Sequence, residues 1–417
     1  MIEPIARWTS TRHRIVDTKG GNVKAKNGTA KYDYLIVGAG PFGATFARTM
    51  TDHGKKCLII DRRDHIAGNT FTKKIEGIDV HMYGPHIFHT ENDQIWKFVS
   101  QFGQWNKFNY TPRVRHGDKM FSFPINLLTL HQLWGVSTPE EARQKLAEVR
   151  EPIENPQNAE EWLLAQVGRE IYEIFFKGYT TKQWFKEPKD LPAAIVARLP
   201  IRLTYNDGYF RDQHQAIPSG GYTEIFQNMM DGIDVEIGQD FFPMKDTWHK
   251  IADRLVFTGP IDQYFDYEFG KLEYRANRFE MEIHEGDYQG HYVINYPSID
   301  VPHTRITEHK HFAESGPKHI KEAKQTKTVI TKDIPIEPHS DEILKDPHYP
   351  IRDAKNTRTF EKYRQLAKLH PKILFGGRLG EYKYYDMDQV IGSGLSKALK
   401  MLTEEENRDR TFTKKSA

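Results

Sequence analysis

The chain has 417 residues, which exceeds the size at which one hydrophobic core stops growing, so we expect two or three structural units. Its 59 basic and 57 acidic side chains give a net charge of only +2, which argues against a nucleic-acid-binding surface. The single cysteine, Cys57, excludes disulfides within the chain and fits a reducing compartment. No apolar stretch approaches the roughly 18 residues of a membrane helix, and no signal-peptide core is present. We therefore expect a cytoplasmic protein without a membrane span.

Residues 1–31 are rich in lysine and arginine, contain few apolar residues and show no periodicity. This composition predicts a flexible basic extension.

The segment 32–61 has the order strand, glycine turn, helix, strand, acid. An apolar run at 34–37 leads into the turn, a helical pattern follows, and a second apolar run at 57–60 ends in Asp61. The turn contains Gly38, Gly40 and Gly43. This order is typical of a dinucleotide-binding unit.

Each part of this pattern has a physical reason. Gly38 permits the tight turn, Gly40 lets the backbone approach a pyrophosphate, and Gly43 lets the helix pack against the strand. The helix N-terminus favours the phosphates, and Asp61 is placed to accept a hydrogen bond from a ribose hydroxyl. A structural βαβ turn without a ligand remains the alternative, and the motif does not separate FAD from NAD.

The loop-rich segment 65–90 contains His81, His86 and His89. No cysteine or neighbouring carboxylate completes a ligand set, so we expect no metal. Thr90, with Asp93 in capping-box spacing, predicts the start of a helix that ends near 103.

Residues 125–205 carry helical signals. Thr138, Pro139 and Glu141 predict one helix start, and Asn158 with Glu161 predicts another. The segment 168–188 then interleaves aromatic side chains with lysine, threonine and glutamine. An ordinary helix core is the simpler interpretation, but such a surface also suits a stacked base or sugar ring.

The second half of the chain reads mainly as strands. A turn and helix at 219–230 precede strands at 233–238 and 254–259, which we assign to the parallel sheet of the opening unit. Four strand-like segments without intervening helices predict an antiparallel layer: 272–283, 290–298, 303–312 and 327–335. The end of the chain, 372–402, repeats the order strand, glycines, helix.

We therefore predict a mixed α/β fold: a Rossmann-like FAD-binding domain with an inserted helical bundle and an antiparallel sheet layer. The predicted units are the basic extension 1–31; a discontinuous FAD-binding domain of 32–100, 218–260 and 360–405; a helical bundle of 125–205; a sheet domain of 101–124, 206–217 and 261–359; and a tail of 406–417.

Five segments together resemble bacterial UDP-galactopyranose mutases. They are GAGPFG with its acidic strand end, YGPHIFHT (83–90), FFKGYTTKQW (175–184), TRITEHKHF (304–312) and FGGRLGEYKYYDMDQVI (375–391). The likeness runs in order from about residue 31 to about residue 401. The third and fifth segments are the specific ones, since other flavoproteins share only the opening turn.

The resemblance implies an isomerase that interconverts UDP-galactopyranose and UDP-galactofuranose without net redox change. FAD, active when reduced, acts through N5 as a nucleophile on the anomeric carbon and displaces UDP. The family also implies a homodimer.

The resemblance also implies the site residues. Those implied for catalysis are Arg198, Arg305, His86 and Asp386. Those implied for substrate binding are Phe175, Phe176, Tyr179, Thr180, Trp184, Arg198, Tyr209, Arg305, Tyr349 and Tyr384. Those implied for the cofactor are Gly38, Gly40, Gly43, Asp61, Arg62, Gly68, Asn69, His86, Arg378, Asp386, Met387 and Asp388.

The chain departs from the family pattern in three places. Asp61 stands where we expect the longer glutamate, and Ala67 stands where we expect glycine. The basic extension is additional.

Three other functions fit parts of this pattern. A mutase that accepts UDP-N-acetylgalactosamine would need a wider pocket near His86. A flavin amine oxidase or dehydrogenase would share the FAD domain, and a non-enzymatic escort protein would keep the fold without the flavin. A pyridine-nucleotide-dependent reductase is disfavoured, because GSG at 392–394 lacks the third glycine and the strand of a second dinucleotide motif.

Overall fold

The computed structural model describes residues 32–197, 200–315, 326–338 and 340–415. Its strands are β1 (Tyr32–Val37), β2 (Cys57–Asp61), β3 (Thr72–Ile75), β4 (Ile78–His81), β5 (Phe88–Thr90), β6 (Trp105–Lys107), β7 (Arg113–His116), β8 (Lys119–Ser122), β9 (His214–Pro218), β10 (Asp234–Ile237), β11 (Ala252–Phe257), β12 (Tyr274–Arg275), β13 (Asn277–Glu285), β14 (Val293–Asn295), β15 (Arg305–Glu308), β16 (Lys327–Pro335), β17 (Tyr349–Pro350) and β18 (Ile373–Phe375).

The main helices are α1 (Pro41–Asp52), α2 (Asp93–Val99), α3 (Leu127–Trp134), α4 (Pro139–Val149), α5 (Ala159–Ile171), α6 (Gly178–Trp184), α7 (Gly221–Met229), α8 (Ile261–Tyr264), α10 (Asp341–Lys345), α11 (Ala354–Ala367), α12 (Gly377–Gly380) and α13 (Met387–Lys415). A π-helical stretch, Tyr172–Lys177, joins α5 to α6.

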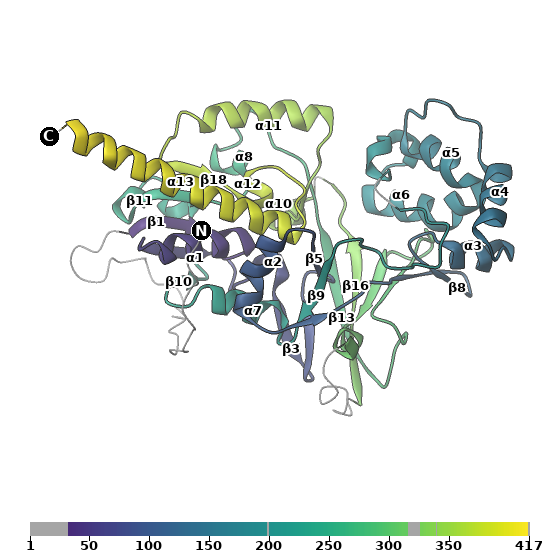
Figure 1. Ribbon diagram of the computed structural model, residues 1–417. Coiled ribbons are helices and arrows are strands. Elements are labelled where there is room, and N and C mark those ends of the chain that lie inside the picture. Colours follow the sequence, from purple (N-terminus) through teal and green to yellow (C-terminus); the bar gives the residue numbers. More distant parts are fainter. Residues whose placement is uncertain (1–31, 198–199, 316–325, 339, 416–417) are drawn as a thin grey trace.

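A five-stranded parallel sheet of order β10-β2-β1-β11-β18 forms the first layer. Alternate residues of β1 point to opposite faces, as the strand period requires. Tyr34 and Ile36 pack under α1, α7 and α13, whereas Leu35 joins a second core on the other face, which includes Tyr363 of α11. Figure 1 shows α1 and α13 on the same side of this sheet. The strands predicted at 233–238 and 254–259 do join it as β10 and β11.

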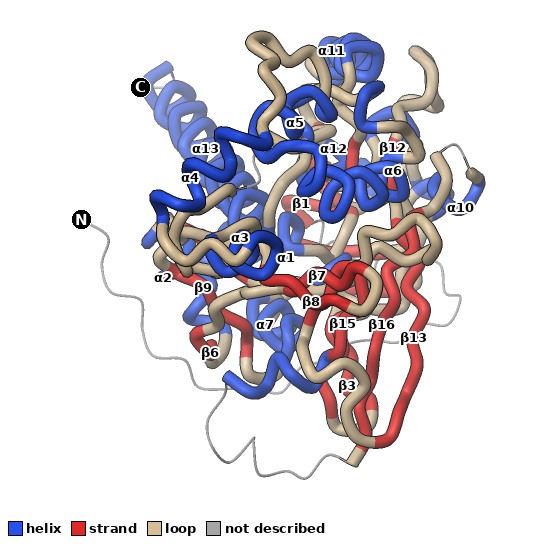
Figure 2. The backbone as a smooth tube through the Cα atoms, turned by 90° about the vertical axis from the view of Figure 1, so that its right-hand side faces the viewer, coloured by secondary structure: helices blue, strands red, loops and turns tan. Residues whose placement is uncertain are grey.

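The second layer is a six-stranded sheet of order β13-β16-β15-β14-β7-β8. Figure 2 shows its strands below the bundle helices α3 to α6. Four of its five pairings are antiparallel, as predicted, but β14 pairs in parallel with β7. The parallel pair arises because β7 comes from the earlier segment 113–116, so no hairpin connects it to β14.

Helices α3 to α6 form a bundle apart from the parallel sheet (Figure 1), with its own apolar core. The two helix starts predicted within the bundle, at Thr138 and Asn158, are confirmed. Thr138 accepts a hydrogen bond from the Glu141 N–H while the Glu141 side chain reaches back to the Thr138 N–H. Asn158 accepts from the Glu161 N–H in the same way.

Two sequence expectations about helix ends are wrong. Asn92, not Thr90, caps α2, because the Asn92 carboxamide oxygen accepts from the N–H groups of the first turn. Thr90 instead donates to Asp388 at 3.0 Å. At the other end, α13 continues to Lys415 and so includes most of the segment 406–417 that we assigned to a tail.

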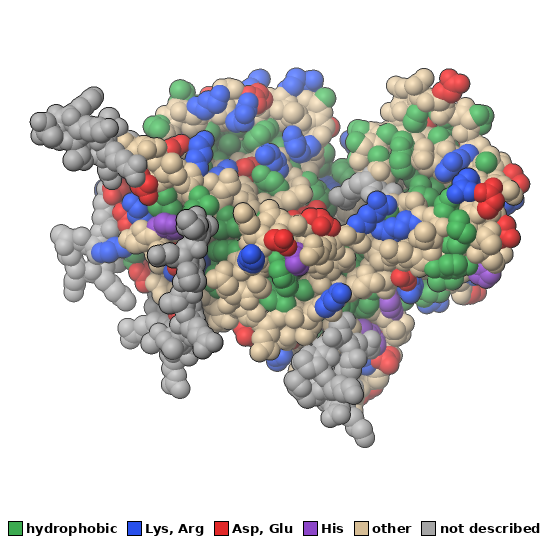
Figure 3. All heavy atoms as spheres, in the orientation of Figure 1, with side chains coloured by type: hydrophobic (Ala, Val, Ile, Leu, Met, Phe, Trp, Pro, Cys, Tyr) green, Lys and Arg blue, Asp and Glu red, His purple; other side chains and the backbone are tan. Residues whose placement is uncertain are grey.

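On the face shown in Figure 3, basic and acidic side chains are interspersed, in keeping with the small net charge. Within the described ranges, no helix is both long and apolar enough to cross a bilayer.

Candidate active site

The glycine turn between β1 and α1 forms one wall of a first cavity. Gly38 has φ +112°, and a Cβ there would lie 2.0 Å from the Thr258 hydroxyl, which donates to the Val37 carbonyl. A Cβ on Gly43 would lie 2.0 Å from the Gly38 carbonyl oxygen. Both positions therefore require glycine. Helix α1 begins after Gly40 with no side chain capping its first turn, so its N-terminus can receive an anion.

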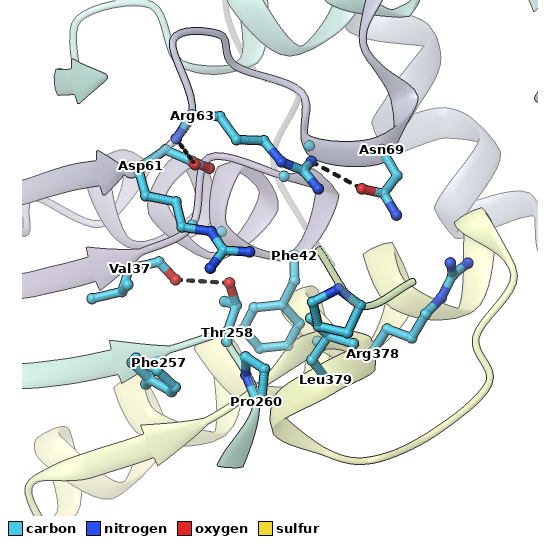
Figure 4. A pocket seen from close by; sticks show the side chains of 18 of the residues that line it. Val37, Phe42, Asp61, Arg63, Asn69, Phe257, Thr258, Pro260, Arg378 and Leu379 are labelled. Atoms are coloured by element: carbon cyan, nitrogen blue, oxygen red, sulfur yellow. Dashed lines mark hydrogen bonds between the residues drawn. The ribbon is translucent and has the colours of Figure 1, made fainter. Parts of the chain in front are cut away.

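Asp61, at the end of β2, is buried beside this turn. One carboxylate oxygen accepts from the Ala39 N–H at 2.8 Å and the other accepts from the Arg63 N–H at 2.9 Å. Figure 4 shows the second of these bonds. The shorter acid therefore fastens the glycine turn to the following loop. Each oxygen keeps a second lone pair that a ribose hydroxyl can use.

Arg63, which was not among the predicted residues, organises the loop after β2, and it lines the first cavity together with the predicted Arg62. The Arg63 guanidinium lies over the Tyr83 ring at 4.6 Å and donates to the side-chain amide oxygen Oδ1 of Asn69 at 2.9 Å (Figure 4). It also pairs with Asp346, in the segment before β17. Burial raises the pKa of Asp346. Hydrogen bonds and the charges of Arg63 and His348 outweigh burial and hold this pKa well below its usual range. The pair thus connects two walls of the cavity.

The first cavity collects most of the predicted cofactor residues. Those that line it are Gly38, Gly40, Gly43, Asp61, Arg62, Gly68, Asn69, His86, Arg378 and Met387. Two do not line it: Asp386 lines the second cavity, and Asp388 is held against Thr90.

The second cavity, of about 800 Å³, lies between the bundle and the six-stranded sheet. The predicted residues that line it are Phe175, Phe176, Tyr179, Thr180, Trp184, Tyr209, Arg305, Tyr349, Tyr384 and Asp386. Arg198, predicted for catalysis and for the substrate, lies outside the described residues. The π-helical stretch before α6 carries Phe175 and Phe176, and such stretches are frequent at functional sites.

Arginine and tyrosine side chains from the six-stranded sheet, from β17 and from the segment around α12 line one part of this cavity. Arg305 on β15 donates through Nε to the buried carboxylate of Asp333. Burial lowers the pKa of Arg305, but the Asp333 charge outweighs burial and raises it. The guanidinium therefore stays charged. Tyr349 and Tyr384 stack with ring centroids 5.0 Å apart, and Arg378 lies 4.6 Å from the Tyr349 ring.

Sequence reasoning missed three arginines that line this cavity: Arg202, Arg211 and Arg275. Arg275 on β12 is buried, and its guanidinium lies 3.7 Å from the centre of the Trp184 ring. Arg275 stands in the segment 272–283, which reads only as an alternating strand. The periodicity therefore gave no signal that this side chain faces the cavity.

His86, Arg378 and Met387 line both cavities and so mark where they meet. The His86 Nδ1 lies 2.8 Å from the Gly84 carbonyl oxygen, so Nδ1 carries the proton and donates. Burial lowers the pKa of His86 to about 4. His86 is therefore neutral at physiological pH, and its Nε2 is an acceptor.

The three predicted histidines do not converge on a metal site. His81 accepts from the His86 backbone N–H, and His89 pairs with Asp212 at 3.0 Å. Among the described side chains, one group has metal-binding composition: Asp287, Glu308 and His311. The Glu308 carboxylate there already accepts hydrogen bonds from the backbone at 288–290 and from a threonine hydroxyl.

A family model of UDP-galactopyranose mutase matches residues 174–384, and a model of an NAD(P)-binding Rossmann-like domain matches residues 36–102. The chain is 40% identical over 383 residues to a probable UDP-galactopyranose mutase of Klebsiella pneumoniae, covering 90% of this chain and 96% of the relative. This chain belongs to the UDP-galactopyranose mutase family.

Other members and neighbours agree with this placement. The chain is 38% identical over 372 residues to a dTDP-fucopyranose mutase of Escherichia coli, covering 86% of this chain and 95% of the relative. A crystal structure of a reduced UDP-galactopyranose mutase has a TM-score of 0.68 at 17% identity, covering 90% of this chain and 94% of that one, which shows a shared fold. The predicted family and the Rossmann-like mixed fold are confirmed, and the protein is a mutase enzyme.

Proposed function

We propose that this protein interconverts UDP-galactopyranose and UDP-galactofuranose, with FAD bound in the first cavity and active in its reduced form. The observation that carries the proposal is the meeting of the two cavities at His86, Arg378 and Met387. A cofactor in one cavity and a nucleotide sugar in the other would come together there. Membership of the mutase family supports the same reaction.

The residues of the first cavity fit FAD. Added Cβ atoms at Gly38 and Gly43 would strike neighbouring atoms, so the turn keeps the close backbone path that a pyrophosphate needs. The uncapped first turn of α1 would take the phosphates, and the spare lone pairs of Asp61 would take the ribose. Reduced FAD would supply N5 as the nucleophile for the anomeric carbon.

The second cavity fits a nucleoside diphosphate. Arg305 and Arg378 provide cationic groups with several N–H donors, and arginine matches phosphate geometry. Tyr349 and Tyr384 would donate hydroxyl hydrogen bonds to the same diphosphate. Phe175 and Phe176, which line the same cavity, would offer aromatic rings to uracil. Arg198 remains a proposed second diphosphate contact.

The neutral His86 bears on the chemistry at the junction. An uncharged imidazole does not repel a cationic centre that develops at the anomeric carbon, whereas an imidazolium would. Its Nε2 can accept a hydrogen bond from a sugar hydroxyl or from the cofactor. We therefore assign His86 to orientation at the junction. Asp386, which lines the substrate side, would help stabilise positive charge during displacement of UDP.

The direct test is to incubate dithionite-reduced protein with UDP-galactofuranose and separate the products by chromatography. We expect UDP-galactopyranose to form, and the oxidised protein to be nearly inert. Arg305→Ala should retain bound flavin but lose turnover, because the diphosphate loses its main cation. Wild-type kinetics in that variant would overturn the assignment of the substrate cavity.

One observation favours a second candidate substrate, dTDP-fucose. The identity to the dTDP-fucopyranose mutase is 38%, close to the 40% for the probable UDP-galactopyranose mutase. Parallel incubations with equal concentrations of UDP-galactofuranose and dTDP-fucofuranose decide between them. We expect the higher kcat/KM with the uridine substrate.

A further inference from the structure

Lys182 in α6 is a buried cation enclosed by backbone carbonyls. Only 9% of the residue is exposed. The Nζ donates to four carbonyl oxygens, all from the loop 296–303 between β14 and β15. They are those of Tyr296 at 2.6 Å, Ser298 at 2.7 Å, His303 at 2.8 Å and Val301 at 3.1 Å.

This arrangement suits an ammonium group and little else. An ammonium has three N–H donors and no acceptor, so four converging carbonyls satisfy it fully. In the same way, rings of carbonyls replace the water shell of a bare cation in ion-binding sites. Burial lowers the pKa of Lys182 to about 8, which Asp300 of the loop opposes, so the group stays charged at neutral pH. A buried charge would be costly without these partners.

The same face of α6 contacts the loop at a second point. Gly178 lies one helical turn before Lys182 and therefore on the same side of the helix. A Cβ at Gly178 would lie 2.2 Å from the Pro297 carbonyl oxygen. The helix thus rests on the loop through one position that must be small and one that must be cationic.

The opposite side of α6 lines the substrate cavity. Tyr179, Gln183 and Trp184 come from this helix, and Asn295 and Pro297 come from the facing loop and the strand before it. In Figure 1, α6 lies on the side of the bundle that faces the rest of the molecule. The docking of helix on loop therefore sets the spacing of two cavity walls.

We propose that Lys182 is a positioning residue for nucleotide-sugar binding, because its ammonium, caged by the carbonyls of 296–303, fixes the aromatic wall of α6 against the sheet. This inference rests on the proposed function, since it assumes that the second cavity binds a UDP-sugar. Lys182 does not itself line that cavity among the described residues. Its effect on the substrate would therefore pass through Tyr179 and Trp184.

The test measures UDP binding to the flavin-loaded protein by calorimetry, together with KM and kcat. Lys182→Met keeps the length of the stem but removes the ammonium. We expect UDP affinity to fall about tenfold and KM to rise similarly, with kcat changing much less, because stacking of a base on misplaced rings is lost. Lys177→Met is the matched control: Lys177 ends the π-helical stretch just before α6, its side chain is 43% exposed, and it pairs with Glu173. It should bind UDP as the wild type does.

Chemical rescue provides the readout that general stabilisation would not give. Lys182→Ala removes three carbons and the ammonium, so n-propylammonium replaces the missing part. We expect it to restore most of the UDP affinity, while tetramethylammonium, which has no N–H donor, and sodium chloride at equal ionic strength do not.

The outcomes separate this inference from the proposed function. If the wild type fails to bind UDP, the proposed function falls and this inference falls with it. If the wild type binds UDP and Lys182→Met binds it equally well, or loses only thermal stability, Lys182 merely stabilises the fold and the inference alone is wrong. Should Lys182→Met fail to fold, Lys182→Arg decides, because it keeps the charge but misplaces the donors: unchanged UDP affinity would overturn the inference.

Discussion

Arg305 and Asp333 form an ion pair in which the acid is buried and the base lines the second cavity: the Asp333 side chain is 0% exposed and the Arg305 side chain is 23% exposed. The Nε of Arg305 donates to one carboxylate oxygen. This bond fixes the Nε side of the planar guanidinium and so orients the two terminal nitrogens. We infer that Asp333 determines how Arg305 presents itself to a diphosphate.

Asp333→Asn should destabilise the protein and weaken UDP binding together. The substitution leaves Arg305 without its counter-charge, and breaking a buried pair in this way costs about 3–5 kcal/mol. Urea unfolding measures the first effect and calorimetry with UDP measures the second. A cycle with Arg305→Met separates pairing from the individual losses. Additivity within about 0.5 kcal/mol would show that the two side chains are not coupled.

Ala67 provides a test of backbone strain beside the cofactor cavity. The sequence led us to expect glycine here, and the structure gives the reason: Ala67 has φ 70° and ψ 1°, in the left-handed region. That conformation costs an L-residue about 1–2 kcal/mol, whereas glycine adopts it freely but loses more entropy on folding.

We therefore expect Ala67→Gly to change the free energy of unfolding by less than about 1 kcal/mol, because relief of strain and loss of a buried methyl offset each other. Ala67→Val should destabilise by about 2 kcal/mol or more, since a β-branched residue is strained in this region and the site is fully buried. Thermal unfolding of both variants checks this. Equal stability of the two would show that the backbone at 67 relaxes.

Local sequence signals identified those parts of the fold that depend on near neighbours. The glycine turn and the capping box at Thr138 follow from spacing within a few residues, and the strand-like composition of β10 and β11 was enough to assign them to the parallel sheet. The parallel pairing of β14 with β7 depends on two segments about 180 residues apart, which no local pattern specifies. Arg275 escaped notice for a similar reason, because its partner Trp184 lies in another domain.

The Arg275–Trp184 contact should contribute to nucleotide binding. The guanidinium stacks on the indole, and desolvated contacts of this kind are worth up to about 2 kcal/mol. Arg275→Lys keeps the charge but loses the planar group that stacks on the indole. We therefore expect UDP affinity to fall about tenfold. Arg278→Lys, at an exposed position on β13, is the control and should bind normally. Normal UDP binding by Arg275→Lys would show that the stacking is incidental.

The buried histidine His309 should make the protein sensitive to mild acid. Its Nδ1 accepts from the His81 N–H at 3.2 Å, its Nε2 lies 3.0 Å from the Thr331 hydroxyl, and only 1% of the residue is exposed. Burial lowers the pKa of His309 to about 3. The ordinary value is about 6.5, so between these values the unfolded chain binds one more proton than the native protein.

The free energy of unfolding should therefore fall as the pH drops below about 6.5, by about 1.4 kcal/mol per pH unit for this histidine. His309→Gln keeps a donor and an acceptor but does not titrate, so it should reduce the slope by that amount. Urea unfolding between pH 4.5 and 6.5 measures the slope, with the exposed His249→Gln as the control. If the wild type and His309→Gln lose stability in parallel, then His309 binds its proton in the native state and is not held neutral by burial.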